Sequence, residues 1–445
     1  MVIKCKSKLF CVKPKNKDYA TFLKNILLAL KLNPMRVLFI NIKSLVARQE
    51  SLSSPLRGKL MQHLPVLNNS WLYCEKGMIS DFGTGNGYMD IQVDEIIDCT
   101  GKFVLPSFID SHTHIVFAAT REAEFVDRIN GLTYEEIAQK GGGILNSAVM
   151  LQKQTEQDLY EASHTRACRQ IQQGTGAIEI KSGYGLTVKD ELKMLRVIAT
   201  LKQNLPIPIK ATFLGAHAFP MEYKQDHEGY IKLIIEEMLP NIAAEGLADY
   251  IDVFCDRGFF SVSETGRILE AGAKYGLKPK IHGNELGRTG GVQVAIQHQA
   301  VSVDHLEEIG EDEINLLTQV ETIATVLPGT SFFLGIPYAP ARKLVDAGAA
   351  LCIATDFNPG SSPNGRMSFM LSLACIKMKL LPEEAFNACT INAACALELQ
   401  HELGSISKGK LANFIITKPI NSIAVLPYMF GEDIIDAVYI NGKKV

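Results

Sequence analysis

The segment from Pro106 to His114 holds the residues of this chain that are best suited to chemistry. It reads Pro-Ser-Phe-Ile-Asp-Ser-His-Thr-His and follows a short apolar run at 103–105. We predict a strand over Phe108–His114, in which residues two apart share a face and have Cα atoms roughly 6.5–7 Å apart. His112 and His114 would then point the same way and could bind one metal ion at about 2.0–2.1 Å. A His-x-His pair also arises by chance on a surface, so this hypothesis depends on the rest of the chain.

Further along the chain, apolar segments alternate with helical stretches, and most end in polar residues. Examples of the helical stretches are Lys189–Asn204, Ile231–Leu239 and Val262–Tyr275. The eight predicted strands are Phe108–His114, Ala177–Lys181, Lys210–Ala216, Ile251–Cys255, Lys280–His282, Ser302–His305, Ile323–Val326 and Leu351–Ala354. Such an α/β alternation is typical of parallel sheets. A (β/α)8 TIM-like barrel has its active site at the carboxyl ends of the strands, which explains the polar ends better than a doubly wound open sheet does.

Short strands and turns flank this predicted barrel at both ends of the chain. The expected strands are Val37–Ile42, Ser70–Cys74, Met78–Phe82, Glu95–Asp98, Ala412–Thr417 and Ala437–Ile440. We interpret them as one small composite β-sandwich domain formed by both chain ends. The predicted division is a basic extension at 1–34, the first part of the sandwich at 35–104, the barrel at 105–403 and the second part of the sandwich at 404–445.

The composition indicates a soluble globular protein. The formal net charge of the 445 residues is only −3, so we expect neither nucleic acid nor membrane as a partner. The ten cysteines form no C-x-x-C pair, which favours free thiols in a reducing compartment, the cytoplasm. Residues 1–34 carry eight lysines and one acidic residue, Asp18. We interpret them as a solvated, disordered extension, or as the product of a start codon upstream of Met35.

Five of the ten histidines lie at predicted strand ends: His112, His114, His217, His282 and His305. Any one of them could be a core histidine, but five on one rim favour a site. His112, His114 and His282 together with Asp356 would offer three nitrogens and one carboxylate. This set suits one Zn²⁺ or Fe³⁺ ion better than Mg²⁺ or Ca²⁺, which prefer oxygen ligands. A metal of this kind acidifies a bound water and so supplies hydroxide near neutral pH.

Other ionisable residues near these strand ends could complete a site. Glu285, three residues after His282, could accept a proton from the water, or could be a solvated loop carboxylate. Lys181 could bridge two metals if carbamylated, but a salt-bridged lysine and a single metal are favoured. Arg121 and Arg288 could each bind a substrate carboxylate through a planar guanidinium, or could be surface arginines. Arg121 follows the metal strand closely and is the better candidate.

Several runs in this order resemble the metal-dependent amidohydrolase superfamily and, within it, the imidazolonepropionase family. Besides Pro106–His114, the runs are Thr120–Phe125, Gly141–Ile144, Lys181–Leu186, Phe213–His217, His282–Glu285 and Thr355–Gly360. The likeness extends from about Met35 to the C-terminus. It implies hydrolysis of 4-imidazolone-5-propanoate to N-formimidoyl-L-glutamate, a step of histidine degradation, by attack of metal-bound hydroxide on the ring amide carbonyl.

The resemblance also assigns residues to roles. The implied metal ligands are His112, His114, His282 and Asp356. The implied substrate contacts are Arg121, Tyr184, His217, Glu285, Asn358, Gly360 and Ser361. Ser107, Ser111 and Ser361 depart from the family pattern, which usually has Gly, Pro and Thr at these places. We expect Glu285 to position substrate and water, and His305 to transfer the proton, although either could do so.

The sequence is also compatible with other activities. Another amidohydrolase, such as a cyclic ureide hydrolase or an aminohydrolase of a heterocyclic amine, would use the same barrel and metal ligands. Only Arg121, Tyr184 and His217 would distinguish it. A non-catalytic descendant would be expected to have lost ligands, and all four are present. The expected partner is a small-molecule substrate, with a homodimer as the candidate assembly.

Overall fold

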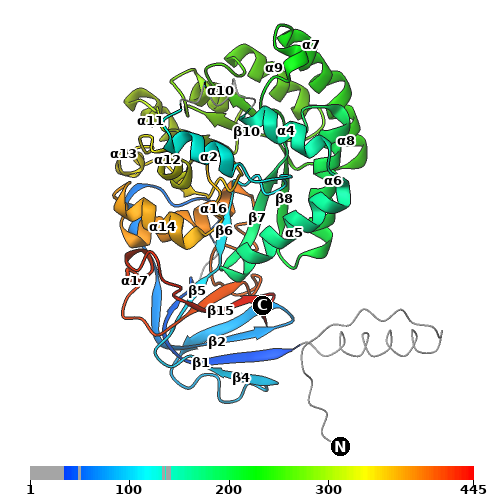
Figure 1. The fold of residues 1–445 in the computed structure, drawn as a ribbon. Coiled ribbons are helices and arrows are strands. Elements are labelled where there is room, and N and C mark those ends of the chain that lie inside the picture. The colour runs from blue at the N-terminus through cyan, green and yellow to red at the C-terminus, as the bar shows by residue number, and fades with distance from the viewer. Residues whose placement is uncertain (1–34, 49–51, 133–135, 137–141) are drawn as a thin grey trace, which may run out of the picture.

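Eight parallel strands form a barrel in the computed structural model, which describes residues 35–48, 52–132, 136 and 142–445 (Figure 1). The strands are β6 (Phe108–Asp110), β7 (Thr175–Lys181), β8 (Ile209–Ala216), β9 (Tyr250–Cys255), β10 (Lys278–Gly283), β11 (Ser302–His305), β12 (Ile323–Val326) and β13 (Leu351–Ile353). Each pairs with the next strand along the chain. A bridge between Thr113 and Phe357 links the segments that follow β6 and β13, on the two edges of the sheet. The predicted barrel is confirmed.

The first barrel strand is shorter than predicted. It ends at Asp110 and not at His114, because the backbone beyond it bonds to both neighbouring segments and not along one regular ladder. His114 N donates to Phe357 O at 2.9 Å, and Lys181 N donates to Thr113 O at 2.9 Å. The two histidines of the His-x-His pair therefore follow the strand and are held by the closure of the barrel.

Helices surround the barrel in Figure 1. They are α2 (Glu122–Ile129), α4 (Ile144–Gln152), α5 (Glu156–Gln172), α6 (Val188–Asn204), α7 (His227–Leu233), α8 (Leu239–Glu245), α9 (Val262–Ala273), α10 (Gly291–Gln297), α11 (Glu311–Leu317), α12 (Pro328–Leu334), α13 (Ala341–Ala347), α14 (Met367–Ile376), α15 (Pro382–Ala388), α16 (Ile391–Ala396) and α17 (Val425–Tyr428). The predicted helix at Ile231–Leu239 spans parts of α7 and α8 and the π-helical turn between them, Ile234–Met238. Burial of Leu195, Ile198 and Leu201 shows how an apolar stripe at helical spacing fixes α6 on the barrel.

Strands from both chain ends form the second sheet, below the barrel in Figure 1. They are β1 (Arg36–Val46), β2 (Val66–Glu75), β3 (Met78–Thr84), β4 (Glu95–Asp98), β5 (Phe103–Pro106), β14 (Phe414–Thr417), β15 (Ile435–Ile440) and β16 (Lys443–Lys444). The ring of Phe39 on β1 lies 5.1 Å from Phe414 and 4.9 Å from Tyr439, measured between centroids. Such aromatic packing gains stability only when both ends of the chain are present, which accounts for the composite domain.

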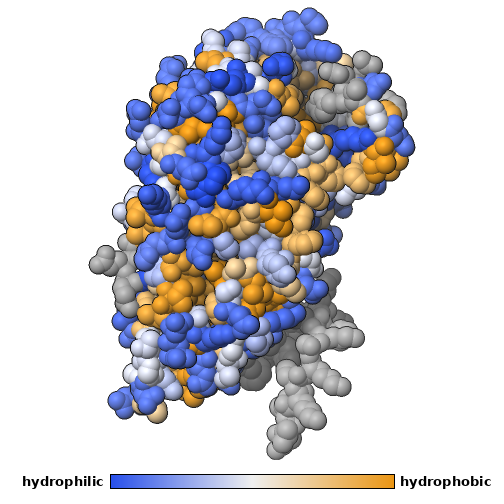
Figure 2. Space-filling view, turned by 90° about the vertical axis from the view of Figure 1, so that its left-hand side faces the viewer, coloured by the Kyte–Doolittle hydropathy of each residue, from blue (hydrophilic) through white to orange (hydrophobic). Residues whose placement is uncertain are grey.

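The surface of the molecule mixes polar and apolar residues. On the face in Figure 2, hydrophobic patches are interrupted by hydrophilic residues over both the barrel and the second sheet. Among the described residues, no helix combines the length and apolar character that a membrane crossing requires. The predicted basic extension at 1–34 lies outside the described residues.

Candidate active site

A cavity lies at the carboxyl ends of the barrel strands. The predicted site residues that line it are His114, Arg121, Tyr184, His217, His282, Glu285, His305, Asp356, Asn358, Gly360 and Ser361. His112 is fully buried and lies against the ring of His114, with centroids 5.2 Å apart. The structure thus brings together the four predicted metal ligands and the residues that the resemblance assigned to substrate contact and proton transfer.

Three histidines and one aspartate converge at one point of this cavity. His114 Nε2 lies 3.2 Å from His112 Nε2 and 3.4 Å from His282 Nε2. The Asp356 Oδ1 atom is 3.5 Å from both His112 Nε2 and His114 Nε2. A tetrahedral ion bound at about 2.0–2.1 Å needs ligand atoms about 3.3–3.4 Å apart. The spacing of these atoms therefore fits one transition-metal ion.

Hydrogen bonds determine which ring nitrogens are available to such an ion. His112 Nδ1 is 2.6 Å from Asp304 Oδ2, and His282 Nδ1 is 2.9 Å from Asp252 Oδ2. Because Asp304 accepts the Nδ1 proton of His112, and Asp252 lies beside Nδ1 of His282 and favours a proton there, the Nε2 lone pairs of both rings face the common centre. Burial lowers the pKa of His112 and of His114 well below the usual value, so that both imidazoles are neutral. A metal ion binds histidine through an unprotonated ring nitrogen, so these Nε2 atoms are suitable ligands.

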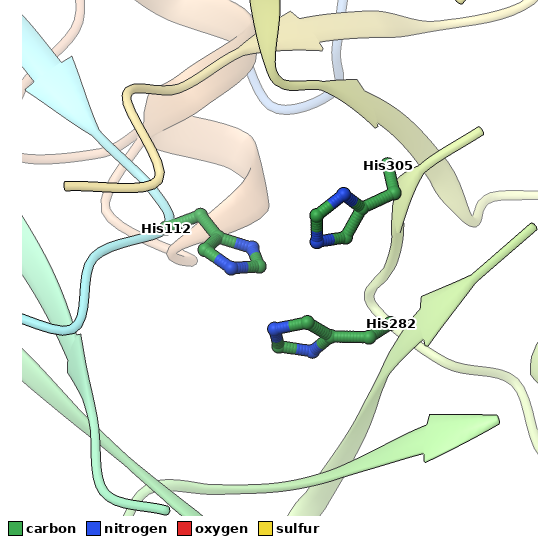
Figure 3. A group of neighbouring side chains, drawn as sticks. All are labelled: His112, His282 and His305. Atoms are coloured by element: carbon green, nitrogen blue, oxygen red, sulfur yellow. The ribbon is translucent and has the colours of Figure 1, made fainter. Parts of the chain in front are cut away.

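His305 approaches the same centre from β11 and creates a second, overlapping group with His112 and His282 (Figure 3). Its two ring nitrogens face carboxylates, with Nε2 at 3.6 Å from Glu285 Oε2 and Nδ1 at 3.5 Å from Glu307 Oε2. Burial opposes protonation, but these carboxylates raise the pKa of His305 to about 10. A protonated imidazole cannot bind a metal, so the two neighbouring carboxylates favour a role for His305 in proton transfer.

Glu285 lies at the start of the loop after β10. Its backbone N–H donates to Asp256 Oδ2 at 2.8 Å, which fixes the position of this residue. Burial raises the pKa of the Glu285 carboxyl to about 7, although the neighbouring His305 opposes the shift. A buried carboxyl beside an imidazole is an arrangement typical of groups that exchange protons during catalysis.

Lys181 does not offer a free amine for carbamylation. Its Nζ atom is 2.6 Å from Glu179 Oε1 and 2.8 Å from Asp252 Oδ2, and all three side chains are fully buried. Burial opposes the charged form of this lysine, but the carboxylates raise its pKa above the usual value. The amine is therefore a cation within a salt-bridge network, as the sequence analysis favoured.

Arg121 also lines the cavity and lies directly before α2. Its Nε and one Nη atom donate to the Glu124 carboxylate at 3.0 and 2.6 Å. The other carboxylate oxygen of Glu124, Oε1, accepts a hydrogen bond from Gly143 N at 3.2 Å. Gly360 allows this approach, because a Cβ atom there would lie 2.0 Å from Arg121 Nη1. The Arg121 guanidinium thus lies between the carboxylate of Glu124 and the backbone of Gly360.

Replacement of Gly360 by alanine is expected to displace Arg121 and to weaken substrate binding. The new methyl group would overlap the guanidinium, and a shift of about 1 Å can cost on the order of 10²-fold in activity. We expect kcat/KM to fall by roughly 10–100-fold with unchanged metal content. Alanine at the exposed Gly431, where a Cβ meets nothing within 4 Å and the φ is not positive, provides a surface control that shares only the substitution. Unchanged kinetics in the Gly360 variant would contradict the role of this contact.

Tyr184 and His217 form an aromatic wall beside the proposed ligands. The ring of His217 stacks on that of His114 with centroids 5.3 Å apart, and Tyr184 lies 5.4 Å from His217. His217 Nδ1 donates to Gly183 O at 3.0 Å, while burial lowers the pKa of His217 to about 3. The neutral ring therefore has an acceptor nitrogen at Nε2, which suits an N–H of a heterocycle.

Asn358 and Ser361 belong to the loop after β13, and their polar groups form hydrogen bonds within that loop. Asn358 Oδ1 accepts from Gly360 N at 2.7 Å and from Ser361 N at 2.8 Å, and its Nδ2 donates to Asp356 O at 2.7 Å. Ser361 Oγ donates to Asp356 Oδ2 at 3.4 Å. Both residues line the cavity and also shape the backbone around Asp356, which has a positive φ of 51°.

One arginine and two aromatic residues of the cavity wall were not predicted from the sequence. Arg128 lines the cavity, and one of its Nη atoms donates to Gly360 O at 3.1 Å. It follows Arg121 by seven residues, a helical spacing that could have revealed it. Phe254 and Phe259 add apolar surface. Arg288, in contrast, is absent from the cavity lining and pairs with Asp312 and Glu313 on the surface.

Comparisons with known proteins identify the family and the fold. Residues 103–445 match the model of the amidohydrolase family. The solved structures of a triazine hydrolase variant and of a zinc-bound adenosine deaminase from Xanthomonas campestris share the fold. The triazine hydrolase variant has a TM-score of 0.67 at 15% identity, and the match covers 92% of this chain and 94% of that one. The adenosine deaminase has a TM-score of 0.68 at 16% identity, and the match covers 93% of each chain.

Two curated relatives are much more similar in sequence. The imidazolonepropionase of Christiangramia forsetii is 54% identical over 411 residues, which cover 92% of this chain and 100% of the relative. The imidazolonepropionase of a Geobacillus species is 41% identical over 417 residues, 92% of this chain and 98% of the relative. Identity at this level over the barrel and the composite sheet leaves one conclusion: the chain belongs to the imidazolonepropionase family of amidohydrolases.

Proposed function

We propose that this enzyme hydrolyses 4-imidazolone-5-propanoate to N-formimidoyl-L-glutamate. The observation that supports it most directly is that His114 Nε2 lies 3.2, 3.4 and 3.5 Å from His112 Nε2, His282 Nε2 and Asp356 Oδ1, in a cavity that Arg121 also lines. The substrate carries a cyclic amide, which is the bond to be cleaved, and a carboxylate, which matches a guanidinium. The cavity volume of about 130 Å³ is close to the roughly 150 Å³ of a protein cavity that can bind a benzene ring, so it suits a small heterocyclic substrate.

One metal ion, zinc or iron, would be held by His112, His114, His282 and Asp356. When bound, such an ion lowers the pKa of a water molecule and polarises a carbonyl oxygen. The nitrogen-rich ligand set favours these metals over magnesium and calcium. Thr330 Oγ1 donates to Asp356 Oδ2 at 2.6 Å, which leaves Oδ1 directed at the histidines.

The protein supplies the proton transfers of the reaction. In hydrolysis, the ring carbonyl carbon gains the water oxygen and loses its bond to the ring nitrogen, while one water proton moves to that nitrogen. Glu285 would orient the water and accept its proton. His305, within 3.6 Å of Glu285, would deliver a proton to the departing nitrogen. This division of roles is supported by the carboxylates on both nitrogens of His305, which keep it in the donor form.

Arg121 would bind the propanoate carboxylate, and Tyr184 and His217 would contact the ring. Glu124 occupies Nε and one Nη of the guanidinium, so that the remaining N–H groups are those available to substrate. With the carboxylate anchored at one side of the cavity and the metal ligands at the other, the amide carbonyl would be directed at the reacting centre.

Turnover measurements with purified enzyme test the proposal. We expect imidazolone propanoate to be converted to N-formimidoyl-glutamate, detected by its mass, and expect no comparable turnover of cyclic ureides or heterocyclic amines. Efficient hydrolysis of a cyclic ureide, or deamination of a heterocyclic amine, without turnover of imidazolone propanoate would assign the chain a different activity in the same superfamily.

Replacement of Arg121 by lysine tests the carboxylate contact. Lysine keeps the charge but loses the planar fork, so we expect kcat/KM to fall by roughly 10–100-fold with unchanged metal content. Arg288→Lys is the matched control, because Arg288 lies outside the cavity lining, and its kinetics should equal those of the unmodified enzyme. A loss in the Arg288 variant with none in the Arg121 variant would move the carboxylate contact to Arg288.

A further inference from the structure

Five charged side chains lie buried in the barrel interior beneath the proposed metal ligands. They are Glu179, Lys181, Asp252, Lys280 and Asp304, and each is at most 1% exposed. Removing an ionised group from water costs free energy, which pairing with an opposite charge offsets. This network therefore destabilises the fold unless its ion pairs have good geometry. The proton-transfer scheme above uses none of these five residues.

Lys181 lies at the centre of this network. Its Nζ atom is 2.8 Å from Asp252 Oδ2 and 3.7 Å from Asp304 Oδ2. The same Asp252 Oδ2 atom lies 2.9 Å from His282 Nδ1, and the same Asp304 Oδ2 atom lies 2.6 Å from His112 Nδ1. One ammonium group therefore contacts the two carboxylate oxygens that orient two of the proposed ligands.

We infer that Lys181 is a positioning residue of the metal site, which it controls through Asp252 and Asp304. By attracting both Oδ2 atoms, the lysine fixes where each carboxylate accepts the Nδ1 proton of its histidine. The two rings then keep their Nε2 lone pairs on the common centre before any ion arrives. This inference rests on the proposed metal site and extends it from four ligands to the lysine that links two of them.

Lys280 offers an internal comparison. It is fully buried like Lys181 and also contacts Glu179. Its other contacts are Ser111 O at 3.3 Å and the face of the Tyr250 ring at 5.1 Å. Neither aspartate is in ion-pair contact with Lys280, although the charge of Lys280 also acts on Asp304. The two lysines therefore share burial and charge but differ in their connection to the histidines.

The test compares Lys181→Met with Lys280→Met in Zn²⁺ affinity, measured by competition with a chelator. We expect binding to weaken by roughly 10–100-fold in the Lys181 variant, the usual cost of losing an outer-shell partner. The Lys280 variant should keep an affinity close to that of the unmodified protein. Equal losses in the two variants, or no loss in Lys181→Met, would overturn the inference. If the unmodified protein itself bound no ion, the proposed site would fail instead.

A second readout needs neither metal nor turnover. In ¹H–¹⁵N NMR spectra of the metal-free protein, His112 and His282 should carry the proton on Nδ1, and Lys181→Met should mix the two tautomers. The double variant Lys181→Met/Glu179→Gln removes one buried charge of each sign and guards against misfolding. We expect it to fold but to bind Zn²⁺ as weakly as the single variant. Restored affinity would mean that Lys181 only balances charge, contrary to the inference.

Discussion

The protein with His114 replaced by alanine is expected to lose both its bound metal and its turnover. His114 Nε2 lies 3.2 Å from His112 Nε2 and 3.4 Å from His282 Nε2, so its loss removes a central nitrogen of the donor set. The loss should exceed the roughly 10–100-fold that removal of an outer-shell partner costs. Elemental analysis and steady-state kinetics on the same preparation measure both effects.

The control for this variant is His164→Ala. His164 lies on α5 beside Cys168 and is absent from the cavity lining, so metal content and turnover should remain unchanged. A His114 variant with full metal content and full activity would show that the proposed ligand set is wrong.

Replacement of Glu285 by glutamine, or of His305 by asparagine, is expected to lower kcat by about 10²–10⁴-fold while metal remains bound. Neither residue belongs to the proposed ligand set, and their side chains approach each other to 3.6 Å. If the two act as one proton-transfer unit, the double variant should lose little more than either single variant. Steady-state kinetics, with metal analysis of each preparation, provide the measurement.

The opposite outcome is equally clear. Near-normal kcat and an unaltered pH–rate profile in both single variants would mean that neither group transfers a proton in the rate-limiting step. A loss of metal in His305→Asn would instead place His305 among the ligands, in the second group that it forms with His112 and His282.

The barrel could be predicted from the sequence because each strand is a short apolar run followed by polar residues. β11 and β12 have the predicted bounds, Ser302–His305 and Ile323–Val326. β6 does not, because the regular ladder stops at Asp110 and the following residues bond to the last residue of β7 and to the segment after β13. Those contacts depend on barrel closure, which local periodicity does not contain.

The candidate site could be predicted in its residue types but not in its supporting contacts. The spacing of His112 and His114 is visible in the sequence. The aspartate that orients His112, Asp304, is 192 residues away along the chain, and no local pattern links the two. Similarly, the sequence suggested Arg121 and Arg288 for the substrate carboxylate and favoured Arg121, but only the fold shows that Arg121 lines the cavity and that Arg288 does not.

Titration of the metal-depleted protein with Zn²⁺ or iron, while turnover of imidazolone propanoate is followed, tests the central claim most directly. The account predicts no turnover without metal, and a linear recovery that reaches its maximum at one ion per chain, because three histidines and Asp356 form one centre. Full turnover of the metal-free protein, or a maximum reached only at two ions per chain, would contradict it.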